Sequence, residues 1–143
     1  MGIRIVIVED DAKFRDAFAH AIRGADDMEL VAVAAHGREG LEALDRYRPD
    51  VLLVDLDLPD VRGLELIRHA HVHVPECDAM VVTVFGDERH VLESIEAGAT
   101  GYLLKDSQPA DILDHVRGLR AGGSPISPVI ARLPSSRSAS SRC

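Results

Sequence analysis

Two groups of carboxylates stand at the ends of apolar runs, where buried strands should end. Asp55 closes the run 51–54 and is followed at once by turn-forming residues, while Glu9 and Asp10 close the run 3–8. If these strands are neighbours, the carboxylates meet and repel: a pair about 4 Å apart costs about 4 kcal/mol at an effective dielectric of 20. A divalent cation would offset this cost. Because the ligands are all oxygens, few in number and beside open water, we expect Mg²⁺.

Two further apolar runs end in single polar residues, Thr83 and Lys105. Thr83 supplies a hydroxyl and Lys105 an ammonium. A dianionic group on Asp55 would therefore find a metal ion, a positive side chain and a hydrogen-bond donor around it. This combination predicts a site for a phosphoryl group.

The elements that position these residues alternate between strands and helices. Continuous aliphatic runs are typical of strands buried on both faces of a sheet, and helical patterns fill the gaps between them. The expected strands cover residues 3–8, 29–34, 51–55, 79–84 and 101–104. The expected helices cover residues 12–23, 38–47, 63–71, 88–97 and 109–120. We therefore predict a doubly wound, flavodoxin-like α/β fold with parallel strand order 2-1-3-4-5, whose strands 1 and 3 flank the ligand-binding switch point.

Composition limits the function classes. The chain has 143 residues and a formal net charge of -8, which argues against gripping nucleic acid or an anionic membrane unaided. No apolar stretch approaches the roughly 20 residues of a membrane span, and the N-terminus runs straight into a strand pattern without a signal peptide, so we expect a cytoplasmic protein. One domain is expected over residues 1–121. Residues 122–143 should form a linker remnant and a disordered, Ser/Arg-rich tail.

Over residues 3 to about 121, the chain resembles the receiver domains of two-component response regulators. The resemblance rests on residues in the expected order and spacing, which are Glu9, Asp10, Asp55, Pro59, Gly63, Thr83, Tyr102 and Lys105. The segments 96–106 and 123–132 are similar to the NarL/LuxR-type subfamily. The sequence diverges where the linker of that subfamily leads into a helix-turn-helix domain.

The resemblance implies a role for each motif residue. Asp55 would be the phosphoacceptor, and Lys105 would contact the phosphoryl group. Glu9 and Asp10 would form an acidic pocket. In this arrangement the Mg²⁺ ligands would be Asp10, Asp55 and the backbone carbonyl of Asp57. Thr83 and Tyr102 would be the switch pair.

The resemblance also implies partners and an output. A sensor histidine kinase would donate the phosphoryl group, and the receiver would form a homodimer or control an attached domain. DNA would be bound only through a C-terminal domain absent from this chain, for transcription regulation. The receiver itself would be a phosphoacceptor with at most slow self-dephosphorylation, not an enzyme.

Two other classes of function compete with this hypothesis. The pair Asp55 and Asp57 after a strand resembles the nucleophile motif of haloacid-dehalogenase-type phosphatases, which also use Mg²⁺. That motif, however, normally lies on the first strand of a larger chain, and Pro59 stands where a Thr or Val would be expected. The other alternative is an interaction module that has kept the fold and is not phosphorylated.

Several residues also have simpler interpretations. Asp11 is as well placed to cap the first helix as to neighbour a metal. The spaced histidines His69, His71 and His73 could bind zinc, but we disfavour this because the run should leave the helix for a loop before Pro75. Cys77 should be a small packed or surface residue.

Overall fold

The computed structural model describes residues 2–122, which form one parallel sheet and the helices that cover it. The strand order is β2-β1-β3-β4-β5 and every neighbouring pair is parallel. The strands are β1 (Ile3–Val8), β2 (Met28–Ala34), β3 (Val51–Val54), β4 (Asp78–Thr83) and β5 (Gly101–Leu104). The helices are α1 (Ala12–Arg23), α2 (Gly37–Tyr47), α3 (Gly63–His73), α4 (Glu88–Ala97) and α5 (Pro109–Arg120). The predicted flavodoxin-like fold and strand order are therefore confirmed.

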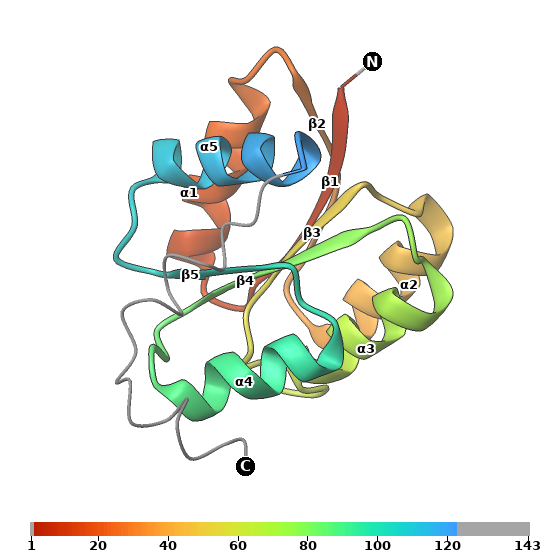
Figure 1. Cartoon of the computed structure of the whole chain (residues 1–143). Helices are drawn as coiled ribbons and strands as arrows, with labels where there is room; N and C mark the ends of the chain where they lie inside the picture. The colour runs from red at the N-terminus through yellow and green to blue at the C-terminus, as the bar shows by residue number, and fades with distance from the viewer. Residues whose placement is uncertain (1, 123–143) are drawn as a thin grey trace.

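Helices cover both faces of the sheet, with α1 and α5 on one side and α2, α3 and α4 on the other (Figure 1). Successive residues of a strand point to opposite faces, and the core divides accordingly. Ile5 and Ile7 pack with the α1–α5 layer, whereas Val6 and Val8 pack with the other layer. All four side chains are fully buried, which explains why the strands are continuous aliphatic runs rather than alternating ones.

Helix ends follow local capping chemistry. Asp11 caps α1, since its side chain accepts hydrogen bonds from the backbone N–H groups of Lys13 and Phe14, so the capping interpretation of Asp11 is confirmed. At the C-terminus of α4, Gly98 adopts a φ of 115°, a left-handed conformation that favours glycine.

Element boundaries differ from the predictions by one or two residues at several places. The prediction that α3 ends at residue 71 is wrong, because the helix continues to His73. The backbone N–H of Val74 still bonds to the carbonyl of Ala70, and the Val74 side chain is fully buried. The core thus holds the last turn in place until Pro75. Predicted features of residues 123–143 lie outside the described residues.

Parallel strands bring all their carboxyl ends to one rim of the sheet. Val8 is paired with Val54, and Thr83 with Leu104. The residues that follow these strands therefore lie at the same edge. Among residues 2–122, no helix is long and apolar enough to cross a membrane.

Candidate phosphoacceptor site

Asp55 lies directly after β3, at the centre of the rim. Its backbone N–H donates to the carbonyl of Val8 at the end of β1, and its side chain is largely buried. Its Oδ1 accepts a long hydrogen bond of 3.4 Å from the N–H of Asp57. Gly63 starts α3 against the Asp55 backbone, where a Cβ would overlap the Asp55 carbonyl oxygen. Glycine at this position lets the helix approach the phosphoacceptor candidate closely.

The structure brings Glu9, Asp10 and Asp55 together. Carboxylate oxygens of the three residues lie within 4.8 Å of one another, and they are the one group of three metal-ligand side chains so arranged in residues 2–122. Glu9 is only 2% exposed, whereas Asp10 is open to solvent. Burial raises the pKa of Glu9 to about 7, and the charge of Asp55 adds to this effect while the hydrogen bond from Lys105 opposes it. The cluster can therefore offer oxygen ligands to a divalent cation.

Lys105 reaches this cluster from the end of β5. Its Nζ lies 2.9 Å from Glu9 Oε2 and 3.1 Å from Asp55 Oδ2. Burial opposes the charged form, but the hydrogen bonds to the two carboxylates prevail and raise the pKa of Lys105. The ammonium also lies 4.6 Å from the centre of the Phe14 ring. One positive charge thus stands beside an acidic cluster that it cannot fully neutralise.

Thr83 and Tyr102 lie on the neighbouring strands β4 and β5, where Tyr102 pairs with Val81 and Thr83 with Leu104, and both are fully buried. The Thr83 Oγ1 accepts a hydrogen bond of 3.4 Å from the N–H of Phe85, and the Tyr102 hydroxyl donates to the Phe85 carbonyl. Burial raises the pKa of the Tyr102 hydroxyl, so it remains a donor at neutral pH. Both candidate switch residues therefore hold the backbone of one residue in the segment between β4 and α4.

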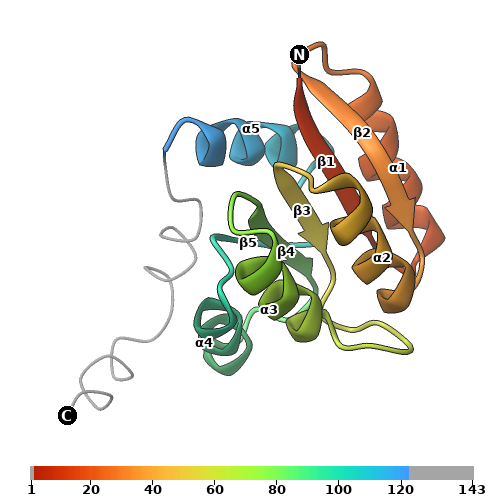
Figure 2. The same ribbon diagram turned by 90° about the vertical axis from the view of Figure 1, so that its right-hand side faces the viewer.

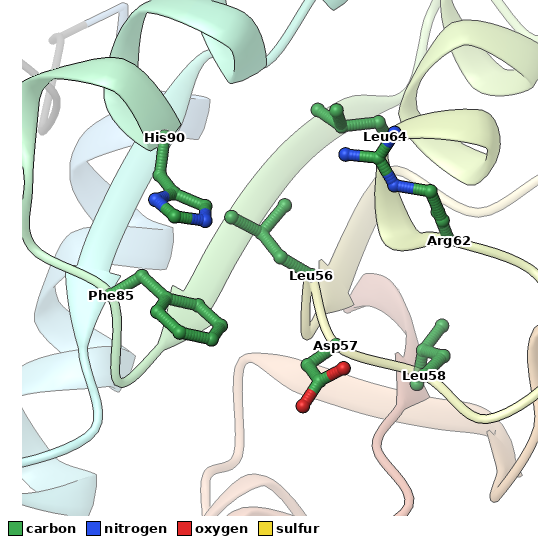
Figure 3. Close-up of a pocket in the computed structure, with 7 residues that line it drawn as sticks. All are labelled: Leu56, Asp57, Leu58, Arg62, Leu64, Phe85 and His90. Carbon is green, nitrogen blue, oxygen red and sulfur yellow. The ribbon is translucent and has the colours of Figure 1, made fainter.

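A pocket of about 170 Å³ opens beside Asp57, between the segments that follow β3 and β4 (Figure 3). The rings of Phe85 and His90 form one wall, stacked 4.4 Å apart and nearly parallel. Leu56, Leu58, Arg62 and Leu64 complete the lining. No pattern in the sequence points to this pocket, because the stack depends on how the segment after β4 folds back onto α4.

Asp60 is a second feature that the sequence did not predict. Its two carboxylate oxygens accept hydrogen bonds from the backbone N–H groups of Gly37 and Arg38 at 2.7 and 3.0 Å, so Asp60 caps α2 from a distant segment. These backbone hydrogen bonds, that of Arg38 first, lower the pKa of Asp60 to about 2. Asp60 thereby ties the segment after Asp55 to α2. A lone Asp after a proline gives no signal in the sequence beyond a turn.

Comparison with known proteins agrees with this geometry. A family model described as the response regulator receiver domain matches residues 5–117. The chain belongs to this receiver family. The receiver domain predicted from the motif residues is therefore confirmed.

Curated relatives of this receiver are transcriptional regulators. The chain is 31% identical over 128 residues to the transcriptional regulatory protein DegU of Brevibacillus brevis, an alignment that covers 90% of this chain and 54% of DegU. It is 35% identical over 121 residues to the oxygen regulatory protein NreC of Staphylococcus epidermidis, covering 84% of this chain and 56% of NreC. The receiver thus spans about half the length of these relatives.

Solved structures give the same assignment. A LuxR-family two-component response regulator from Aurantimonas superposes with a TM-score of 0.87 at 28% identity, over 97% of this chain and 99% of that one. The receiver domain of NarL from Mycobacterium tuberculosis superposes with a TM-score of 0.81 at 25% identity, over 85% and 98%. This protein is a receiver of the LuxR/NarL group of response regulators, consistent with a phosphoacceptor in two-component signalling.

Proposed function

We propose that this receiver accepts a phosphoryl group on Asp55 from a sensor histidine kinase, with Mg²⁺ bound beside it. The observation that carries the proposal is the meeting of Glu9, Asp10 and Asp55 with the ammonium of Lys105. The carboxylates of Asp10 and Asp55 and the backbone carbonyl of Asp57 would hold Mg²⁺, which would offset charge on the phosphoryl oxygens. An oxygen-only set beside open solvent fits this hard cation.

In the transfer step an Asp55 carboxylate oxygen attacks the phosphorus, and the bond from phosphorus to the kinase histidine nitrogen breaks. The imidazole leaves with the bonding electron pair, and the product is an acyl phosphate on Asp55. Lys105 would turn from the Asp55 carboxylate to the new phosphoryl oxygens, since its Nζ is already within hydrogen-bond distance of that side chain. Glu9 would keep the other contact of Lys105 and limit its movement.

Thr83 and Tyr102 would carry the signal from the phosphoryl group. The Thr83 hydroxyl would donate to a phosphoryl oxygen. Movement of the Thr83 side chain towards the phosphoryl group would weaken the hydrogen bond from the Phe85 N–H to Thr83. The segment between β4 and α4, whose Phe85 carbonyl also accepts from the Tyr102 hydroxyl, would then shift. Because the Tyr102 ring is already fully buried, phosphorylation would tighten the contacts around an inward ring.

The output would be transcription regulation in a cytoplasmic two-component system. A homodimer, or an attached DNA-binding domain, would respond to the phosphorylated state. Residues 1–121 would be the receiver unit and residues 122–143 a linker and tail. The acyl phosphate would be lost by slow self-dephosphorylation at most, so this chain would not act as an enzyme.

Incubation with acetyl phosphate, followed by intact-mass measurement, tests this function. The wild type should gain one phosphoryl group in Mg²⁺ and none in EDTA, and Asp55→Asn should gain none. A phosphorylated Asp55→Asn protein would refute the assignment of Asp55. An unmodified wild type would favour the interaction module, and repeated turnover of an exogenous phosphoester would favour a phosphatase.

A further inference from the structure

His69 and His73 lie on one face of α3 and do not belong to the cluster of Glu9, Asp10 and Asp55. Because α3 continues to His73, His69 and His73 are one helical turn apart, and their ring centres are 4.5 Å from each other with a tilt of 39°. This i, i+4 spacing on a helix is the one that lets two imidazoles bind a single metal ion. A zinc site was disfavoured because a loop was expected within the histidine run. In the structure the whole run is helical.

A carboxylate from the neighbouring helix joins this pair. Helices α2 and α3 lie side by side (Figure 2), and Asp45 Oδ1 is 2.7 Å from His69 Nε2. The Asp45 side chain is 60% exposed and that of His69 is 24% exposed. A carboxylate at this distance can bind a metal beside the imidazole or orient the ring through a hydrogen bond. In this contact His69 Nε2–H donates to the carboxylate; a metal ion that replaces this proton would leave the ring proton on Nδ1 and take Nε2 as a ligand.

The space next to these residues is open. A groove of about 380 Å³ runs between α2 and α3, and His69 and His73 form part of its wall together with Leu41, Val61, Glu65, Arg68 and Val72. Ligand atoms of Asp45, His69 and His73 do not all lie within 4.8 Å of one another as they stand. His73 is exposed, so rotation of its side chain can bring the third ligand atom into place.

We propose that Asp45, His69 and His73 form a site for a divalent transition-metal ion, with Zn²⁺ as the best match. Two imidazoles and one carboxylate suit Zn²⁺, Ni²⁺ or Cu²⁺, whereas Mg²⁺ prefers an oxygen-only set. Three protein ligands leave a coordination position for water in a tetrahedral Zn²⁺ site. Bound metal would link α2 to α3.

His71 supplies the matched control. It belongs to the same helix and the same histidine run, but it lies against α4, where a Cβ at Gly98 would stand 2.8 Å from the His71 Cβ. Loss of the His71 imidazole should therefore leave the proposed ligands unchanged. Asp45→Asn tests the site independently, because it changes α2 rather than the histidine run.

The test is a calorimetric Zn²⁺ titration of the 143-residue protein in excess Mg²⁺, with Cys143→Ser throughout so that the terminal thiol does not compete. The parent should bind one Zn²⁺. His69→Ala and His73→Ala should each weaken binding by roughly tenfold or more, Asp45→Asn should weaken it in the same direction, and His71→Ala should leave it unchanged. A parent without saturable binding, or His73→Ala and His71→Ala proteins with equal affinities, would overturn the proposal.

Discussion

Glu9→Gln should make the metal-free receiver more stable at alkaline pH. Glu9 is buried, and its pKa is raised from 4.5 to about 7 in the folded protein. A carboxyl whose pKa is higher in the folded state contributes stability below the unfolded value, and this contribution is lost as the pH rises through the folded value. The wild type should therefore lose stability between about pH 4.5 and 7. Glutamine stays neutral across this range and lacks this loss.

The size of the effect follows from the difference between the two pKa values. At about 1.4 kcal/mol for each pH unit, the interval from 4.5 to about 7 corresponds to about 3 kcal/mol. The pKa of about 7 already includes the opposing effect of Lys105, whose Nζ bonds to Glu9 at 2.9 Å, and a Gln amide oxygen can accept the same hydrogen bond. We expect the unfolding free energy of Glu9→Gln at pH 8 to exceed that of the wild type by up to about 3 kcal/mol.

Urea unfolding followed by circular dichroism, in EDTA between pH 5 and 8, measures this difference. Glu76→Gln is the control, because the Glu76 side chain is 53% exposed and its ion-pair partner Arg48 is 50% exposed; that variant should follow the wild-type pH profile. Addition of Mg²⁺ at pH 8 should raise wild-type stability by binding the folded state. Parallel pH profiles for the wild type and Glu9→Gln would refute the account of a buried carboxyl at this site.

Three other changes test different parts of the structure. Asp60→Asn should lower the unfolding free energy at pH 7. The difference from the wild type should shrink as the pH falls from 3.8 through about 2, where wild-type Asp60 also becomes neutral. A difference in urea unfolding that persists at pH 2 would contradict the role of Asp60 as a cap of α2. Gly63→Ala should lower the unfolding free energy by about 2 kcal/mol, because the new Cβ overlaps the Asp55 carbonyl and lies 2.7 Å from the Leu56 Cα; an unchanged melting curve would argue against this close contact. Thr83→Ala should keep phosphorylation of Asp55 yet weaken beryllofluoride-dependent association, measured by size exclusion with light scattering; a wild-type response would separate Thr83 from the output.

The sequence was sufficient to predict the sheet and the meeting of the acidic residues. Strands buried on both faces are continuous aliphatic runs, and parallel strands must end on one rim. Asp55 and Glu9 follow two of these runs, so the strand order alone was enough to predict that they lie close together. The structure added the contact that decides the electrostatics, in which Lys105 reaches both carboxylates from β5.

Other features depend on contacts between distant segments and leave no local signal. Asp60 caps α2 across 22 to 23 residues of sequence. The last turn of α3 depends on the burial of Val74, which periodicity alone does not distinguish from a loop residue. The inward ring of Tyr102 depends on the Phe85 carbonyl that its hydroxyl bonds to. In each case tertiary packing, rather than local preference, determines the conformation.

Reduction of the phosphorylated protein with borohydride tests the central claim most directly, since this reagent converts an aspartyl phosphate to homoserine at the modified position. After treatment with acetyl phosphate and Mg²⁺, peptide mass mapping should find homoserine at position 55, while Asp10 and Asp57 remain aspartate. Homoserine at either of those two positions, or none in a protein that has gained a phosphoryl group, would contradict the assignment of Asp55 as the phosphoacceptor.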